Sequence, residues 1–172
     1  MDVFEAIASR HSYRGAFTDA PVPREDLRKI VQAGVQAPSG CNKQTPTFVI
    51  VDDPAVLVAV DGIVDLYHPP KALIVCVADP APVYQGMAFE KEDCSAAVEN
   101  MLLAIAAMGY ATVWIDGQLR TDGRAERLGD LLGVPRDRRV QIILPVGVPV
   151  ETCAQAEKSP FEERAWFNVY GG

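Results

Sequence analysis

The chain has 172 residues, a length typical of a single domain. Its 16 lysines and arginines are outnumbered by 23 aspartates and glutamates, which gives a formal net charge of −7 at pH 7. An acidic chain without a local basic stripe repels phosphate backbones, so nucleic acid is excluded from the expected partners. Hydrophobic residues make up 49% and charged residues 23% of the chain, as in a folded globular protein and unlike a disordered one.

Neither a membrane segment nor a metal site is expected. The most apolar stretch, residues 101–115, is interrupted by Gly109 and Tyr110 and is shorter than the ~20 residues that cross a bilayer. The first residues, MDVFE, lack the basic and apolar parts of a secretory signal. The four cysteines form no CxxC pair and the chain has only two histidines, which argues against a zinc ribbon or a disulfide framework. We therefore expect a cytoplasmic protein with reduced thiols.

Hydrophobic spacing predicts an alternation of helices and strands. In chain order these are a helix over 2–9, a helix from Pro23 that ends before Pro38, a strand over 47–52, a short helix over 54–66, a strand over 72–78, a helix over 94–108, a strand over 111–115, a helix capped by Thr121 or Asp122 that ends at Leu132, and a strand over 140–148. This order predicts a sheet sandwiched between helices.

Three of these elements are apolar on more than one face. The strands 47–52 and 72–78 do not alternate apolar and polar residues, so both are expected to be covered on two faces. In the helix 94–108, 12 of the 15 residues are apolar, so it must be buried on most sides. A monomeric domain of this size exposes much of its surface to solvent. A subunit interface would cover this helix.

The chain after residue 150 carries four aromatic side chains, which are Phe161, Trp166, Phe167 and Tyr170. Aromatic side chains bury large apolar areas when they pack. We therefore expect this tail to pack either on its own domain or on a partner subunit.

Three segments have residue types suited to ligand binding. RHSYR at 10–14 brings two arginines and a hydroxyl group together, which suits an anion, although a solvated helix end is the plain alternative. APSGCNKQTP at 37–46 either brings backbone donors close to a planar ligand or simply makes turns. WIDGQ at 114–118 follows a strand, where ligands often bind in open sheets. Gly117 allows close approach there, and a strand-ending turn is the alternative.

Motifs of several enzyme classes are absent from the sequence. It contains no GxGxxG, GxxxxGKS, GxxxxGKT, GxSxG or HExxH. Its two histidines and unclustered carboxylates suit neither a Ser-His-Asp hydrolase nor a metal hydrolase. If the protein is an enzyme, we expect a cofactor to carry the chemistry.

Taken together, four segments resemble the nitroreductase family of FMN flavoproteins. They are RHSYR at 10–14, APSGCNKQ at 37–44, ENMLLAIAAMGYATVWIDG at 99–117 and LPVGVP at 144–149. Each is weak alone, but four in this order at sensible spacing are specific. The resemblance spans residues 3–149 and is weaker in the tail.

The resemblance implies an α+β fold. Its expected form is a three-layer α/β/α sandwich with a central mixed, mainly antiparallel sheet, in an intertwined homodimer with two FMN sites at the interface. Residues 1–172 would form one FMN-binding domain, with 151–172 as a C-terminal arm on the partner subunit.

The resemblance also implies roles for particular residues. Arg10, Ser12 and Arg14 would hold the FMN phosphate, ribityl chain and pyrimidine edge, with His11 beside them through its backbone. The other implied contacts are Pro38, Ser39, Gly40 and Asn42 from the partner chain with Gln44 near the same face, Ile115, Asp116 and Gly117 beside flavin N5, and Lys158 at the phosphate with Arg164 farther along. Segment 61–71 lacks the Asn and Lys of longer relatives, which leaves pyrimidine-edge contacts there open.

The implied activity is a two-step hydride transfer. Hydride would pass from NADH or NADPH to flavin N5 and then to a nitroaromatic, quinone or similar electron-poor small molecule, with no side chain needed as a catalytic acid. Reduction leaves negative charge near flavin N1–O2, which a cation such as Arg14 would stabilise. The alternatives are a specialised enzyme of the same family, acting by dehalogenation, flavin fragmentation or dehydrogenation, and a non-catalytic flavin-binding module.

Overall fold

A four-stranded sheet forms the centre of the molecule, and the computed structural model describes residues 1–171. The strands are β1 (Thr47–Val51), β2 (Ala72–Ala78), β3 (Ala111–Thr112) and β4 (Arg139–Gly147), in the order β1-β2-β4-β3. Each neighbouring pair is antiparallel, so within residues 1–171 the sheet is antiparallel throughout, in agreement with the expected mainly antiparallel sheet. No strand of the described chain lies parallel to either edge of this sheet.

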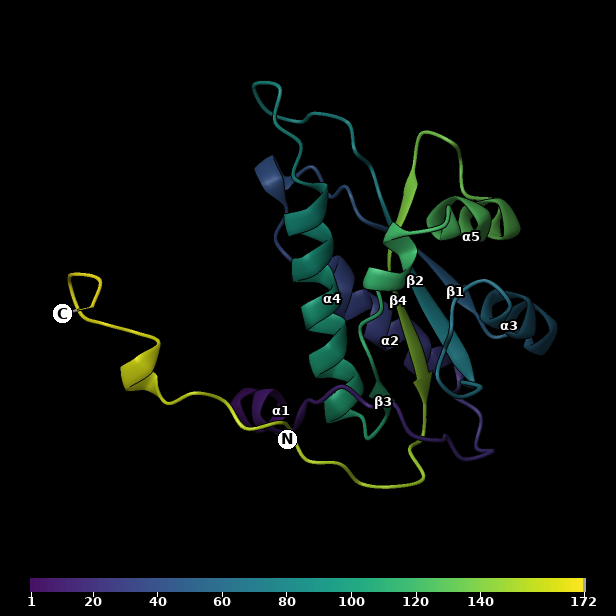
Figure 1. Ribbon diagram of the computed structural model, residues 1–172, viewed down its shortest axis with the longest axis horizontal. Coiled ribbons are helices and arrows are strands. Elements are labelled where there is room, and N and C mark those ends of the chain that lie inside the picture. Colours follow the sequence, from purple (N-terminus) through teal and green to yellow (C-terminus); the bar gives the residue numbers. More distant parts are fainter. Residues whose placement is uncertain (172) are drawn as a thin grey trace.

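Helices cover both faces of the sheet, which confirms the expected α+β sandwich (Figure 1). The α-helices are α1 (Val3–Ser9), α2 (Arg24–Val35), α3 (Pro54–Asp61), α4 (Glu90–Ala107) and α5 (Arg124–Leu132), and the 3-10 helices are η1 (Gly40–Asn42), η2 (Gly117–Arg120) and η3 (Phe161–Glu163). One buried cluster joins α2 and α4 to the sheet, and a second joins α3 and α5 to its other face.

The two strands expected to be covered on both faces differ in outcome. Strand β2 is buried along its whole length: Ile74 and Cys76 pack in the α2–α4 cluster, whereas Leu73 and Val75 pack in the α3–α5 cluster. Strand β1 is an edge strand that is covered on both faces but less completely: Phe48 packs against the α2–α4 cluster and Val51 lies in the α3–α5 cluster, while Ile50 is 40% exposed. A continuous apolar run therefore forms a central strand in β2 and an edge strand in β1.

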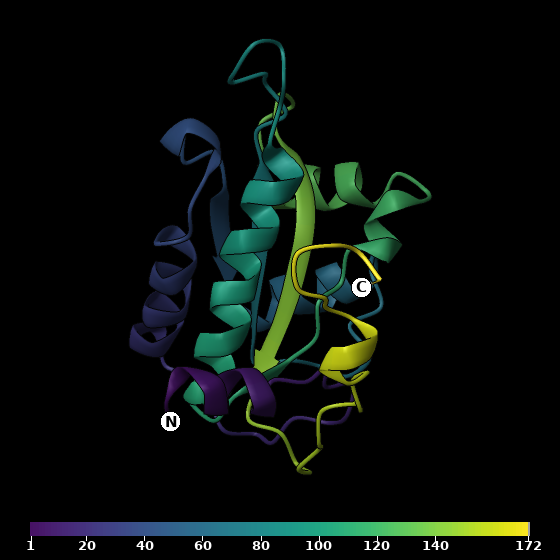
Figure 2. The ribbon, with the colours of Figure 1, turned by 90° about the vertical axis from the view of Figure 1, so that its left-hand side faces the viewer.

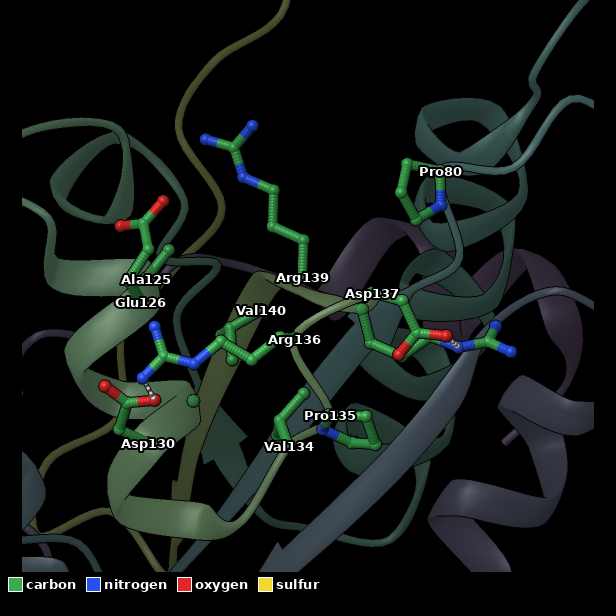
Figure 3. Close-up of a pocket in the computed structure, with 12 residues that line it drawn as sticks. Pro80, Ala125, Glu126, Asp130, Val134, Pro135, Arg136, Asp137, Arg139 and Val140 are labelled. Carbon is green, nitrogen blue, oxygen red and sulfur yellow. Dashed lines mark ion pairs between the residues drawn. The ribbon is translucent and has the colours of Figure 1, made fainter.

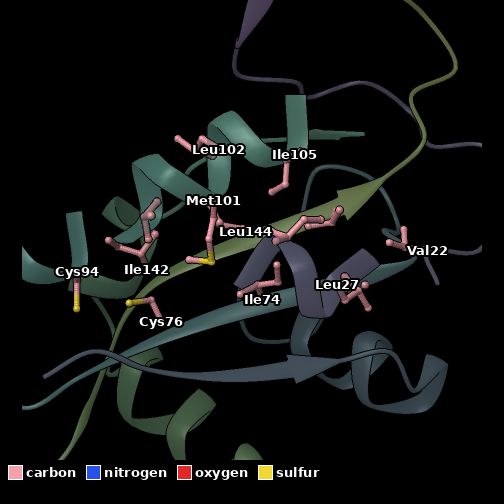
Figure 4. Close-up of a cluster of buried hydrophobic side chains, with 14 of the residues drawn as sticks. Val22, Leu27, Ile74, Cys76, Cys94, Met101, Leu102, Ile105, Ile142 and Leu144 are labelled. Atoms are coloured by element: carbon pink, nitrogen blue, oxygen red, sulfur yellow. The ribbon is translucent and has the colours of Figure 1, made fainter. Parts of the chain in front are cut away.

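Helix α4 contributes five buried side chains to the α2–α4 cluster (Figure 4). It begins at Glu90, four residues before the predicted start, and acidic residues fill its first turn, where they complement the helix dipole. Its middle packs closely on α2, since a Cβ at Gly34 would lie 2.9 Å from Met101 Cγ. Asn100 also donates a 3.1 Å hydrogen bond to the Ala33 carbonyl.

Several predicted boundaries move for local reasons. Helix α3 ends at Asp61 instead of residue 66, because Gly62 takes the C-cap position. Strand β3 has two residues instead of five, and beyond it only Ile115 returns to the sheet, as an isolated bridge to Ile143. Helix α5 begins after the left-handed Gly123 and is capped by neither Thr121 nor Asp122 through a side chain.

The tail leaves the body soon after it passes α1 (Figure 1). Its aromatic rings contact each other, with Trp166 and Tyr170 centroids 4.4 Å apart; Trp166 is half-buried, and the other three rings stay largely uncovered. Phe161 is 58%, Phe167 81% and Tyr170 92% exposed. Of the two expected packing partners, the tail's own domain does not cover these rings.

Among residues 1–171, no helix combines the length and the hydropathy that crossing a membrane requires.

Candidate functional site

Segment 10–14, which we call the cationic segment, is fixed to the sheet through Tyr13. This residue is 2% exposed, and its N–H donates a 2.8 Å hydrogen bond to the Thr112 carbonyl on β3. Its hydroxyl donates to the Ala16 carbonyl at 2.5 Å and accepts from the Val150 N–H at 3.2 Å. Because Tyr13 is anchored inward, its exposed neighbours Ser12 and Arg14 are left free to contact a ligand.

The side chain of His11 faces a cavity, which sequence reasoning had not foreseen. Its Nδ1 lies 2.9 Å from the Ser9 carbonyl, and a carbonyl only accepts, so Nδ1 carries the hydrogen. Its Nε2 is buried without a hydrogen-bond partner, as is Thr112 Oγ1. Both residues line a cavity of about 220 Å³ together with Arg10. Buried polar atoms are normally paired, so these two indicate a missing polar group at this place.

Tyr110 lines the same cavity and links it to α2. Its hydroxyl donates a 2.8 Å hydrogen bond to Asp26 Oδ2. That bond lowers the pKa of the Asp26 carboxyl, while burial and the same bond raise the pKa of Tyr110. The pair connects α2 to the segment that follows α4.

A loop over residues 65–67 connects Arg14 to the turn after β3. The Arg14 guanidinium carbon lies 5.4 Å from the centre of the Tyr67 ring, a cation–π contact. The Tyr67 N–H donates to Asp65 Oδ1 at 2.7 Å, and the Asp65 backbone pairs with the Gln118 side chain through two 3.0 Å bonds. Sequence reasoning assigned no role to Tyr67 or Asp65, and no local motif marks them.

The turn after β3 presents open backbone. Ile115 exchanges two hydrogen bonds with Ile143, at 3.1 and 2.9 Å, which ties the turn to β4. Asp116 forms an ion pair with Arg120. A Cβ on Gly117 would meet no atom within 4 Å, so a ligand has room to approach this backbone closely.

Residues 39–45, which we call the left-handed loop, take an unusual backbone shape. Cys41, Asn42 and Gln44 have φ values of 51°, 54° and 52°, a region that residues other than glycine rarely adopt. Inside the loop, the Gln44 N–H donates to Ser39 Oγ at 2.9 Å. The sequence shows the turn-favouring polar residues of this loop. It does not show which residue of α4 holds the loop in place.

That anchor is Asp93, which is 3% exposed in the first turn of α4. Its Oδ1 accepts a hydrogen bond from the Gly40 N–H at 2.8 Å, and its Oδ2 accepts one from Thr45 Oγ1 at 2.5 Å. The only sequence signal for it was an acidic residue beside a nearly continuous apolar run.

One chain does not bring the two halves of the predicted site together. The cationic segment, residues 65–67 and the turn 115–118 form one connected surface. The predicted partner residues Pro38, Ser39, Gly40, Asn42 and Gln44 lie elsewhere. In Figure 2 their turn η1 lies on one side of α4 (upper left, blue), whereas η2 lies on the other side (right, green).

Lys158 is exposed, and Gln155, three positions before it, contacts the cationic segment. Gln155 Nε2 donates to the Arg10 carbonyl at 2.7 Å and to the Ile7 carbonyl at 3.1 Å. Three extended residues span at most about 10 Å, so Lys158 starts within reach of Arg10. Arg10 itself lies 3.8 Å from a Glu99 oxygen, a loose ion pair that a stronger anion can replace.

A separate cavity of about 260 Å³ lies between α5 and the turn before β4 (Figure 3). It contains ion pairs such as Arg136–Asp130 at 2.9 Å, and Arg139 points away from them. None of the sequence-predicted site residues lines it. In the described part of the chain, no group of three or more histidine, cysteine or acidic residues is placed to hold a metal ion.

Comparison with known proteins gives a consistent result. The family model described as "Nitroreductase family" matches residues 7–69 and 65–148. A relative from Archaeoglobus fulgidus, named "Putative NADH dehydrogenase/NAD(P)H nitroreductase", is 32% identical over 97% of this chain and 94% of its own length. A solved structure with the same name, from Parabacteroides distasonis, is 27% identical with a TM-score of 0.84, covering 98% of each chain.

A third match concerns the fold alone. The NADPH:FMN oxidoreductase from Vibrio harveyi, solved in complex with NAD+, is 23% identical with a TM-score of 0.83, covering 99% of this chain and 78% of its own. The family match covers most of this chain and agrees with the fold and with the four sequence segments. The chain belongs to the nitroreductase family.

Proposed function

We propose that two copies of this chain form an FMN-dependent oxidoreductase that takes hydride from NADH or NADPH and passes it to a nitroaromatic, a quinone or a similar electron-poor acceptor. The observation that carries this proposal is the division of the site across α4. The cationic segment and the left-handed loop cannot serve one ligand within a chain, but a second copy can supply the missing half. Paired chains would then hold two equivalent sites.

The residues fit FMN at several separate places. Arg10 and Lys158 supply cations for a phosphate, and guanidinium groups match phosphate oxygens. The unpaired His11 Nε2 and Thr112 Oγ1 lie beside Arg10 and offer polar partners at the same end. The open backbone at Gly117 admits the edge of a flat ring.

When bound, FMN supplies a ring nitrogen, N5, that accepts and donates hydride. The chain's own contribution is binding and electrostatics. The Arg14 guanidinium, held over Tyr67, places positive charge where an electron-rich pyrimidine edge would be stabilised. Because the cofactor carries the reaction, the site needs an open face for the donor and the acceptor more than an acid or base side chain.

The names of one relative and of one protein with the same fold agree with the proposed hydride donor and cofactor. The Archaeoglobus relative is named for NADH and NAD(P)H, and the Vibrio harveyi protein is named for NADPH and FMN. We further propose that residues 151–171 act as an arm that covers the partner subunit, since their aromatic side chains remain uncovered on their own chain.

The test begins with the purified protein. FMN should bind at one per chain, and NADH or NADPH should bleach it without oxygen. A nitroaromatic or a quinone should then restore the yellow colour. Absence of FMN binding would contradict the proposal. FMN that neither nucleotide bleaches would indicate the non-catalytic module, and bleached FMN that neither acceptor reoxidises would indicate one of the specialised enzymes.

A further inference from the structure

We propose that Asp93 is a positioning residue for the flavin site of the neighbouring copy, acting by setting the shape of the left-handed loop. The inference rests on the proposed function, in which this loop completes the partner's site. Asp93 itself lies behind the loop, 3% exposed, and contacts no ligand.

The carboxylate of Asp93 holds both ends of the loop at once. Gly40 and Thr45 are five residues apart, and each donates to a different oxygen of the same planar group, at 2.8 and 2.5 Å. The Asn42 N–H donates to the Ser39 carbonyl at 2.9 Å and so ties the middle of the loop to its start. Fixing both ends and the middle leaves the left-handed residues little freedom to relax.

The negative charge of Asp93 stabilises this conformation of the left-handed loop. None of the ion pairs among the described residues includes Asp93, so its negative charge is stabilised by the two neutral donors and by the N-terminus of α4. If the loop moved away, a buried carboxylate would lose its hydrogen bonds, which is strongly unfavourable. The loop and the carboxylate therefore stabilise each other.

Steric contact at the same place reinforces the polar one. A Cβ at Gly40 would lie 2.6 Å from a ring carbon of Phe89, the residue just before α4. Only a glycine lets the backbone approach the helix closely enough to reach Asp93. The start of α4 thus sets the loop position by hydrogen bonding and by packing.

The first experiment compares Asp93→Asn with Glu92→Gln. Both remove one negative charge from the same helical turn, but Glu92 is exposed and takes part in no side-chain hydrogen bond or ion pair within residues 1–171. Asp93→Asn turns one acceptor into a donor that faces another donor, so the FMN dissociation constant should rise about 10-fold or more. Glu92→Gln should leave it unchanged. Thr45→Val should weaken FMN binding, and Thr45→Ser, which keeps the donor, should restore most of it.

A mixed dimer shows whether Asp93 acts across the interface. One chain carries Asp93→Asn and the other Arg10→Ala, with different purification tags. If Asp93 serves the neighbour, one site of the mixed dimer receives both defects and the other receives none. The dimer should then bind one FMN with wild-type affinity. If Asp93 served its own chain, both sites would be weakened.

Amide hydrogen exchange of the flavin-free protein gives an independent measurement. Exchange at residues 40–44 should accelerate in Asp93→Asn and not in Glu92→Gln. Unchanged exchange, wild-type FMN affinity in Asp93→Asn, or a mixed dimer without a wild-type site would each overturn the inference and leave the proposed function standing. A wild-type dimer that binds no FMN would overturn the proposed function and the role of Asp93 with it.

Discussion

The body of the molecule, residues 1–150, and the tail, residues 151–171, use their apolar side chains differently. In the body, β2 is buried on both faces and Ile74 and Leu73 each lie in a core of their own chain. In the tail, Phe167 is 81% and Tyr170 92% exposed. The body also leaves large apolar side chains exposed, such as Phe4 at 78% and Val58 at 74%, but most of its apolar residues lie in its two cores, whereas Phe161, Phe167 and Tyr170 of the tail lie in neither. The difference supports the proposal that the tail packs on a second copy.

The largest expected effect comes from removing the tail at Lys158. Loss of the aromatic side chains should raise the dimer dissociation constant about 1,000-fold or more, since two interface hot spots alone contribute about 4 kcal/mol. FMN content should fall as well, because the dimer completes each site. Sedimentation, melting temperature and flavin absorbance measure these changes. Gln155 remains in the shortened chain, so its hydrogen bond to the Arg10 carbonyl at the end of α1 is retained.

Two full-length variants separate the causes. Phe167→Ser combined with Tyr170→Ser should weaken the dimer while Lys158 is retained. Lys158→Gln should weaken FMN binding and leave the dimer intact. A truncated chain with an unchanged melting temperature, dimer and flavin content would show that the tail has no role in the dimer or in the flavin site.

Local apolar patterns foretold much of the body, and contacts distant in sequence decided the rest. The non-alternating run at 72–78 foretold the doubly buried β2, but a similar run at 47–52 became an edge strand, because edge position depends on which strands pair. The cationic segment was visible as a motif. Asp93 and Tyr67 were not, since they act on Gly40 and Arg14 across 53 residues each.

The next effect in size concerns the two arginines of the cationic segment. Charge-assisted hydrogen bonds contribute on the order of 1.5–3 kcal/mol, which is about 10- to 150-fold in affinity. Arg14→Ala should raise the FMN dissociation constant within that range and make the flavin midpoint potential more negative, because a counter-charge is lost. Arg10→Ala should weaken binding with little change in potential.

Titration with FMN and potentiometry of both variants test this contrast. Wild-type affinity in Arg14→Ala would remove Arg14 from the site. Equal potentials in the two variants would reject its electronic role and leave only a binding role.

A smaller effect is expected where the tail first touches the body. Gln155 donates two hydrogen bonds to carbonyls at the end of α1, and each such bond contributes about 0.5–1.5 kcal/mol. Gln155→Glu removes the donor and keeps the size of the side chain. The FMN dissociation constant should then rise about 2- to 10-fold, because the contact that positions Lys158 is lost. Exposed Ala156→Glu, one position on, adds the same negative charge and is the matched control. Equal FMN affinities in the two variants would show that the contact does not guide Lys158.

The smallest effect lies within the body and depends on pH. The hydrogen bond from Tyr110 lowers the pKa of Asp26, so its stabilisation is complete above the ordinary value of about 3.9 and is lost as pH falls through the lowered one. Burial and Asp26 raise the pKa of Tyr110, so its share is complete below about pH 10 and is lost at higher pH. The contribution therefore has an acidic and an alkaline limit.

Tyr110→Phe should thus lower the melting temperature by a constant amount between about pH 5 and pH 9, and the difference from the wild type should shrink outside that window. Lys29, 3.4 Å from Asp26, is present in both proteins and stays charged over this range, because its hydrogen bonds to Glu25 and Asp26 raise its pKa. Tyr170→Phe, in the exposed tail, should leave the melting temperature of the body unchanged at every pH. A difference for Tyr110→Phe that stays the same down to pH 2 would mean that the bond to the Asp26 carboxylate does not account for the stabilisation by the hydroxyl group.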